Sequence, residues 1–189
     1  MAATQDTPGR ADAQRNRQRL IDVAHRAFTT GDGKVSLEAV AKEAGVGIGT
    51  LYRHFPTREA LVEAVYLAER GRLCEAAGEL LTEQPPDQAL RTWMDRFADY
   101  IATKREMADA MRVLIADGTV TRSQAREELS IAVRRLLDAG AAAGTLRADV
   151  PAEDVVAALV GVVSVCTLPE HREQAGRLMD LLMDGLRRW

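Results

Sequence analysis

The sequence contains few cysteines, few aromatic residues and no long apolar run. Its two cysteines, Cys74 and Cys166, lie 92 positions apart and form no C-x-x-C pair, and no histidine stands at metal-ligand spacing. We therefore expect no disulfide framework, no metal site and no cofactor, and a reducing, cytoplasmic environment is the simplest interpretation. Both thiols are interpreted as small buried apolar side chains, with redox sensing as the alternative.

Membrane and export signals are also missing. The first twenty residues lack the apolar stretch of a signal peptide. The most apolar segment, residues 155–168, is shorter than the ~20 residues that cross a bilayer. We therefore expect a soluble protein.

The lack of strand signals predicts an all-α fold. No segment alternates polar with β-branched residues, whereas Ala, Leu, Arg and Glu are abundant. Ser36, Thr57 and Asp87 are expected to cap helices, and Gly45 to end one in the left-handed conformation. Together with apolar periodicity, these signals predict nine helices. They cover about residues 10–30, 36–44, 47–55, 57–82, 87–101, 105–117, 123–143, 151–168 and 170–189.

The charge of the chain is unevenly distributed. The net charge is -3, but residues 1–60 hold nine Lys or Arg against seven Asp or Glu, whereas the remainder holds sixteen against twenty-one. A mildly basic N-terminal part on an acidic body permits local phosphate binding.

The second and third predicted helices match the helix-turn-helix plan, in which the second helix of the pair enters the DNA major groove. Leu51 and Phe55 lie one turn apart and are expected to anchor the third helix on the first two. The turn from Gly47 to Thr50 is then left to project, and its glycines allow a close approach to DNA. The neighbouring side chains, Tyr52, Arg53 and His54, supply donors for phosphate oxygens.

The segments "RLIDVAHRAF" and "VSLEAVAKEAGVGIGTLYRHFPTREALVEAV" resemble the DNA-binding domain of the TetR family of bacterial transcriptional regulators. The resemblance covers about residues 15–65 by motif. The remainder is similar in length, helix count and the "AAAGTLRADVPAEDV" junction. It implies a homodimer of nine-helix subunits that binds a palindromic operator, usually as a repressor released by a small molecule.

The resemblance also implies roles for individual residues. Base-facing positions correspond to Ile48, Gly49 and Thr50, and phosphate-facing or mixed positions to Tyr52, Arg53, His54 and Arg58. Two places depart from the family pattern. Gly47 stands where serine is common, and Leu37 and Glu38 stand where polar or basic residues often contact phosphate. The second helix is therefore expected to contribute only Ser36 and its backbone.

The implied organisation has three parts: a disordered tail at residues 1–9, a DNA-binding domain at 10–56, and a ligand-binding and dimerisation domain at 57–189. Arginines that precede or open the first helix suit a minor-groove arm, with a disordered tail as the equal alternative. They are Arg10, Arg15, Arg17 and Arg19.

An apolar stripe in the fifth and sixth helices suits a ligand pocket, with plain core as the alternative. Its members are Trp93, Met94, Phe97, Tyr100, Met107, Met111 and Leu114. The last two helices are the expected dimer face, with internal packing as the alternative, because nearly every position from 155 to 165 is apolar. The predicted contacts are Val155, Leu159, Val163, Cys166, Leu178 and Leu182.

These features predict a dimeric transcriptional repressor that binds double-stranded DNA and a small apolar effector. One alternative is a helical interaction module without specific DNA binding. A small helical enzyme using His54 or Cys74 is disfavoured, because no nucleophile, base and orienting group stand together.

Overall fold

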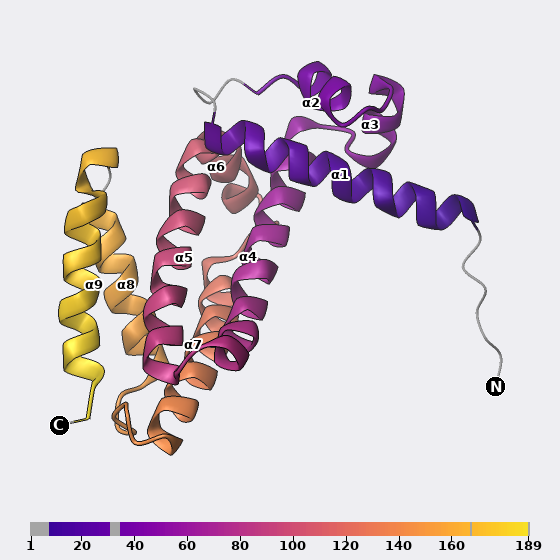
Figure 1. The fold of residues 1–189 in the computed structure, drawn as a ribbon. Helices are drawn as coiled ribbons and strands as arrows, with labels where there is room; N and C mark the ends of the chain where they lie inside the picture. Colours follow the sequence, from indigo (N-terminus) through magenta and orange to yellow (C-terminus); the bar gives the residue numbers. More distant parts are fainter. Residues whose placement is uncertain (1–7, 31–34, 167, 189) are drawn as a thin grey trace, which may run out of the picture. The chain divides into compact units, whose positions relative to one another are not determined.

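A computed structural model describes residues 8–30, 35–166 and 168–188 and shows an all-α fold (Figure 1). The predicted fold class is confirmed. Within the described residues the only extended pairing is an isolated bridge between Leu146 and Arg187. The helices are α1 (Pro8–Thr30), α2 (Leu37–Glu43), α3 (Ile48–His54), α4 (Arg58–Glu83), α5 (Pro86–Glu106), α6 (Ala108–Ala116), α7 (Arg122–Ala142), α8 (Ala152–Val165), the short 3-10 helix η1 (Pro169–His171) and α9 (Arg172–Leu186).

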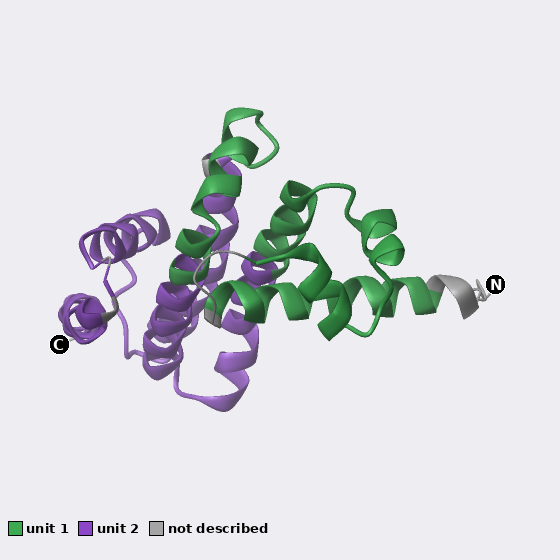
Figure 2. Cartoon of the chain, turned by 90° about the horizontal axis from the view of Figure 1, so that it is seen from above, with its two compact units in different colours: residues 1–68, 102–120 green, residues 69–101, 121–189 purple. Residues whose placement is uncertain are grey.

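The chain divides into two compact units, coloured separately in Figure 2. Unit 1 comprises residues 1–68 and 102–120, and unit 2 comprises residues 69–101 and 121–189. This division differs from the predicted boundary after residue 56, because the first part of α4 and all of α6 belong to unit 1. Residues 1–7 of the predicted tail lie outside the described residues, and residues 8 and 9 belong to α1.

Local capping signals set the helix ends in unit 1. The Ser36 hydroxyl accepts a hydrogen bond from the Ala39 N–H at 3.1 Å, and the Thr57 hydroxyl accepts one from the Ala60 N–H at 3.1 Å. Gly45 ends α2 with a φ of 69°, a conformation that favours glycine. These three predicted signals are confirmed, and they fix the short turn between α2 and α3.

Two predicted ends are shifted by proline. Pro86, rather than a cap at Asp87, lies at the first position of α5, where its missing N–H costs no helix hydrogen bond. Pro169 begins the separate 3-10 turn η1, so α9 begins at Arg172 and not at residue 170.

Trp93 of α5 stacks on Phe97 of the same helix and contacts α4 through a hydrogen bond. Trp93 and Phe97 are both 0% exposed, and their rings stack with centroids 5.9 Å apart. The Trp93 indole N–H donates to the Leu73 carbonyl of α4 at 2.8 Å. The one polar group of this side chain is therefore satisfied inside the unit, as burial requires.

Backbone hydrogen bonds join the connection between α7 and α8 to the end of α9. The Arg147 N–H donates to the Leu186 carbonyl at 2.9 Å, and the Arg188 N–H donates to the Thr145 carbonyl at 3.1 Å. Leu146 occupies the space beside Gly140, where an added Cβ would lie 2.5 Å from the leucine Cγ. Glycine at 140 is thus required by close packing.

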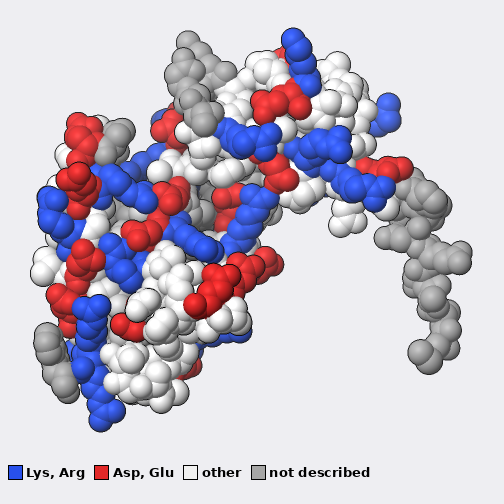
Figure 3. All heavy atoms as spheres, viewed as in Figure 1, with Lys and Arg blue, Asp and Glu red and all other residues white. Residues whose placement is uncertain are grey.

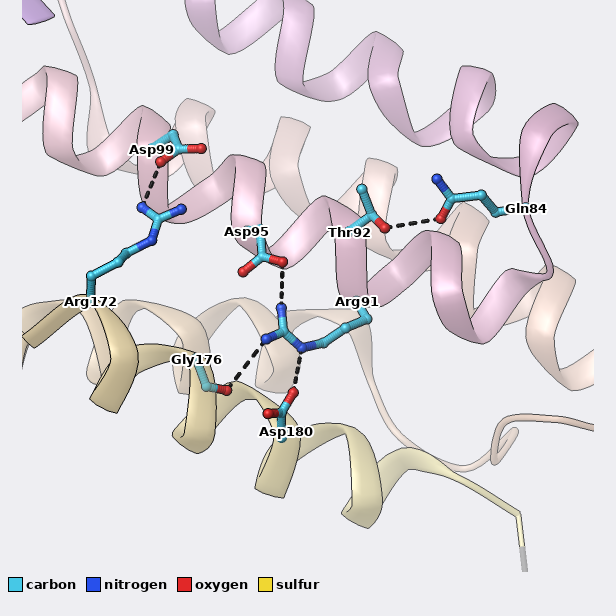
Figure 4. Close-up of polar contacts among 8 residues, drawn as sticks. All are labelled: Gln84, Arg91, Thr92, Asp95, Asp99, Arg172, Gly176 and Asp180. Carbon is cyan, nitrogen blue, oxygen red and sulfur yellow. Dashed lines mark hydrogen bonds and ion pairs between the residues drawn. The ribbon is translucent and has the colours of Figure 1, made fainter.

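Polar contacts along α5 and α9 centre on Arg91 (Figure 4). Its Nε donates to Asp180 Oδ1 at 2.6 Å, Nη1 pairs with Asp95 at 2.8 Å, and Nη2 donates to the Gly176 carbonyl at 3.4 Å. The Arg91 side chain is only 25% exposed, so this contact is more shielded from solvent than a typical surface ion pair. Arg91 therefore links the middle of α9 to α5.

We expect the Arg91→Met substitution to lower the free energy of unfolding by about 1–2 kcal/mol, because Asp180 and the Gly176 carbonyl lose their partner while the apolar stem is kept. Urea denaturation followed by circular dichroism measures the change. Arg112→Met is the control, since the Arg112–Asp109 pair is highly exposed on α6, and its loss is expected to cost less than about 0.5 kcal/mol. Equal effects of the two substitutions would contradict this role of Arg91.

Candidate nucleic-acid interface

Two apolar side chains fix α3 within unit 1. Leu51 and Phe55 are 0% and 2% exposed, and α3 contacts both α1 and α2. The Arg17 guanidinium of α1 lies over the Phe55 ring, 5.2 Å from its centroid, which adds a cation–π contact. The predicted anchoring by Leu51 and Phe55 is confirmed, and it determines which side of α3 faces outward.

The opposite side of α3 is accessible. Gly47, Ile48 and Gly49 are exposed and Thr50 is half-buried. A Cβ atom added to either glycine would meet no other atom within 4 Å. The turn expected to project therefore does project, and base contacts by Ile48, Gly49 and Thr50 stay a prediction.

The predicted phosphate-binding side chains differ in their exposure and in the contacts that they already make within the protein. Tyr52 is 45% exposed, and Arg53 is exposed and makes no hydrogen bond or ion pair with any residue that the structure describes. His54 is half-buried, with its ring centroid 6.2 Å from that of Phe55. Arg58 is exposed at the start of α4. Arg53 is thus the cation of α3 best placed to meet an external anion.

Ser36 is already engaged by its own helix. Its hydroxyl donates to Glu38 Oε2 at 3.0 Å while it accepts from the Ala39 N–H. Backbone hydrogen bonding and the Ser36 hydroxyl hold the pKa of Glu38 below its ordinary value, so this carboxylate stays charged. A phosphate contact by the Ser36 hydroxyl would require breaking the bond to Glu38, and that contact stays a prediction.

The arginines expected to form an arm belong to α1 instead. Figure 3 shows basic side chains along this helix, and in α1 all of them are arginines. Arg15 pairs with Asp12, Arg17 covers Phe55, and Arg19 Nη1 lies 3.5 Å from the Ala44 carbonyl. These three residues therefore lie in the helix, which begins at Pro8, and a minor-groove contact by them stays a prediction. The side chain of Arg10 lies outside the described part.

The side chains expected to line a ligand pocket are all buried. Trp93, Met94, Phe97 and Tyr100 lie in unit 2, whereas Met107, Met111 and Leu114 lie in unit 1. The internal hydrogen bond of Trp93 and its stacking on Phe97 also suit plain core. The pocket assignment stays a prediction.

A groove between α7 and α8 was not predicted from the sequence. This groove has a volume of about 520 Å³ and combines apolar with charged side chains. Its lining comprises Arg126, Glu127, Ser130, Ile131, Arg134, Glu153, Val156 and Ala157. One signal was present in the sequence: Ile131 is an apolar residue on a side of α7 that also carries Glu127 and Arg134. In the structure Ile131 is 63% exposed.

The dimer contacts predicted on α8 fall on positions that are already buried within one subunit. Val155, Leu159, Val163 and Cys166 are between 0% and 8% exposed within one subunit, where α8 packs against α7 and α9. This burial favours the alternative of internal packing, and a contact of these four residues with a partner stays a prediction. Leu178 and Leu182 of α9 are half-buried, and their contact with a partner stays a prediction.

The described residues show neither a metal-binding cluster nor a membrane-spanning helix. Among the residues in the described ranges, no group of three or more His, Cys, Asp or Glu could hold a metal ion. The same residues include no helix that is long and apolar enough to span a bilayer.

Cys74 lies near the ion pair between Arg70 and Glu128, whose paired N and O atoms are 2.8 Å apart. Burial, followed by the charge of Glu128, raises the pKa of Cys74 to about 11.

Two family models match most of the chain. Residues 20–65 match the model described as bacterial regulatory proteins, tetR family. Residues 85–188 match the C-terminal domain of transcriptional regulators similar to SbtR.

Solved structures match over nearly the whole length. A TetR transcriptional regulator from Streptomyces coelicolor is 47% identical with a TM-score of 0.81, over 90% of this chain and 98% of that one. A TetR regulatory protein from Mycobacterium vanbaalenii is 35% identical with a TM-score of 0.74, over 96% and 100%. SmeT, the repressor of a Stenotrophomonas maltophilia multidrug efflux pump, shares the fold at 18% identity, over 94% of this chain and 93% of its own, with a TM-score of 0.59.

Curated relatives match over a shorter stretch. An HTH-type transcriptional regulator of Staphylococcus aureus is 47% identical over 53 residues, which is 28% of this chain and 29% of the relative. This match therefore bears on one domain of that protein only.

We expect Arg53→Ala to weaken binding to duplex DNA about tenfold and to reduce the slope of log affinity against log salt by about one, because one phosphate contact is lost. Fluorescence anisotropy with the DNA that flanks the gene of this protein, between 50 and 200 mM salt, measures both quantities. Arg112→Ala, which removes an exposed cation from α6, is the control and is expected to change neither. An unchanged affinity for Arg53→Ala would remove this residue from the interface.

Cys74 is expected to react slowly with iodoacetamide at pH 8. A pKa of about 11 leaves little thiolate at that pH, so alkylation should be roughly a hundredfold slower than for an ordinary cysteine. The rate should rise about tenfold per pH unit up to pH 10, since the thiolate fraction rises as pH approaches the pKa. Mass spectrometry of the Cys166→Ser variant isolates the Cys74 signal. Alkylation as fast as that of glutathione would instead favour the redox-sensing alternative.

Proposed function

Because the chain belongs to the TetR family of bacterial regulatory proteins, which are DNA-binding transcription factors and not enzymes, we propose that it is a homodimeric repressor, released from a palindromic operator by a small apolar ligand. It acts where the bacterial chromosome lies, in the cytoplasm. One observation carries this proposal. α3 buries Leu51 and Phe55 and leaves the turn from Gly47 to Thr50 open to a partner.

DNA binding combines two kinds of contact. Ile48 and Thr50 face base edges, and Arg53, Tyr52 and Arg58 contact the phosphates on either side of the groove. The exposure of Arg53 and the lack of any partner for it among the described residues support this division. His54 has a smaller part, because its ring is half-buried.

Dimerisation uses the outer sides of α8 and α9. Val165 of α8 and Leu181 of α9 are each 67% exposed, and Leu168 in the connection between the two helices is 50% exposed. An apolar surface is therefore left without cover in one subunit. Gly161 and Gly185 are also exposed, and an added Cβ would meet nothing at either. Small residues beside exposed leucines permit helices of a second subunit to pack closely. A palindromic operator then follows from the two-fold symmetry of the dimer.

Ligand release works by a population shift. A small apolar molecule held by Trp93, Phe97 and their neighbours would favour a state in which α4 holds the α3 helices of the dimer at the wrong separation for successive major grooves. A structure of SmeT with triclosan, 17% identical and with a TM-score of 0.56, is a fold relative solved with a small molecule. The adaptable side chain of Met94 suits varied apolar ligands.

The alternative is an interaction module that has lost specific DNA binding. The two candidate functions differ in the sequence preference of DNA binding that they predict. A repressor binds the DNA beside its own gene far more tightly than random duplex, and this binding weakens steeply with salt. An interaction module shows no preference between the two duplexes.

We expect Leu181→Asp to convert the dimer to a monomer and to weaken operator binding at least tenfold, because a charge in the apolar contact is costly and a monomer reaches only one half-site. Sedimentation velocity measures the mass, and anisotropy measures the affinity.

Val113→Asp is the matched control for Leu181→Asp. Val113 is an exposed apolar residue of α6, at 51%, so its substitution should leave both mass and affinity unchanged. A Leu181→Asp protein that remains dimeric would reject the proposed face, and a wild-type protein that shows no sequence preference would reject the repressor.

A further inference from the structure

The apolar side chain of Ile48 is exposed and does not belong to the buried core of the protein. It is 39% exposed, whereas the residues that anchor α3, Leu51 and Phe55, are almost completely buried. Its branched side chain is stiff about χ1 and loses little freedom when it is covered. Covering such a side chain with another surface is favourable, because its apolar surface is then removed from water.

The two glycines beside Ile48 are not required by the fold. Positive φ angles in the described residues occur at Gly45, Gly118 and Gly144, so neither Gly47 nor Gly49 needs glycine for its backbone conformation. Packing does not require glycine there either, because an added Cβ would meet nothing within 4 Å at both positions. Glycine at 49, inside α3, costs stability relative to alanine. Bare backbone on both sides of Ile48 lets another molecule approach this side chain closely.

The chemistry of Ile48 limits what it can recognise in DNA. Its side chain neither donates nor accepts hydrogen bonds, so it cannot distinguish the donor and acceptor pattern of a base pair. In the major groove the apolar group available to it is the C5-methyl of thymine. A guanine or cytosine edge would instead leave polar groups without a partner beneath the isoleucine.

We propose that Ile48 determines part of the operator sequence by packing on the C5-methyl group of one thymine in each half-site. This inference rests on the proposed DNA-binding function and adds a base preference to it. The flanking glycines allow the α3 backbone to come near enough for the methyl group to be enclosed. Arg53 and Tyr52 contact the phosphate backbone of the DNA and fix the position of the protein on the duplex. They do not contribute to the preference for thymine.

The test removes a single methyl group from the DNA. The probe is the tightest duplex selected by the wild-type protein from a random-sequence pool, with each thymine replaced in turn by deoxyuridine in both half-sites. Base pairing is kept, so only the methyl is lost. At one thymine position the affinity, measured by fluorescence anisotropy, is expected to fall about fourfold for each methyl removed.

A double-mutant cycle assigns that methyl to Ile48. Ile48→Ala is expected to weaken binding to the thymine duplex roughly tenfold and to abolish the difference between thymine and deoxyuridine at that position. Ile48→Val, which keeps a branched side chain, is expected to retain most of the difference. Val113→Ala, which shortens an exposed apolar side chain of α6, is the control and should preserve the difference in full. Ile48 is exposed, so an unchanged melting temperature checks that each variant is folded.

The outcomes separate this inference from the proposed function. If the wild-type protein selects a specific duplex but no thymine-to-deoxyuridine change alters affinity, the protein binds DNA and the thymine contact is rejected. The same holds if Ile48→Ala keeps the full sensitivity to deoxyuridine. If no duplex is enriched by selection, the repressor proposal is rejected and the thymine contact with it.

Discussion

The DNA-binding side of this protein depends on the burial of Leu51 and Phe55. A helix of seven residues is too short to persist in water by its own hydrogen bonds, so α3 exists because these two side chains pack on α1 and α2. Arg17 strengthens the same contact by covering the Phe55 ring. Every group offered to a partner by α3 is positioned by this one apolar contact.

Sequence patterns predicted local features well and long-range ones poorly. Ser36, Gly45 and Thr57 act on their own neighbours, so their positions were sufficient to place the helix ends. The dimer contacts chosen on α8 fell on buried positions for a physical reason. That helix is apolar on nearly every side, and periodicity alone cannot tell a side covered by α7 and α9 from one left open. The Arg91 contacts join residues 85 to 89 positions apart, which no local pattern reveals.

Charge pairing explains how an acidic chain can present a cation to DNA. Many of its arginines are neutralised within the protein: Arg26 pairs with Glu43, Arg134 with Glu153 and Arg172 with Asp99. Arg53 has no such neighbour among the described residues, so its charge is exposed to solvent without local compensation. Binding to the phosphate backbone therefore depends on whether individual basic side chains are exposed and not paired within the protein, and not on the net charge of -3.

The backbone pairing between the end of α9 and the turn before α8 ties the last residues of the chain to a loop some forty positions earlier. Those final residues are consequently not a dispensable extension. Truncation just ahead of Leu186 would remove both the carbonyl that accepts from the Arg147 N–H and the N–H of Arg188 that donates to the Thr145 carbonyl, so the turn before α8 would lose both of these links to α9.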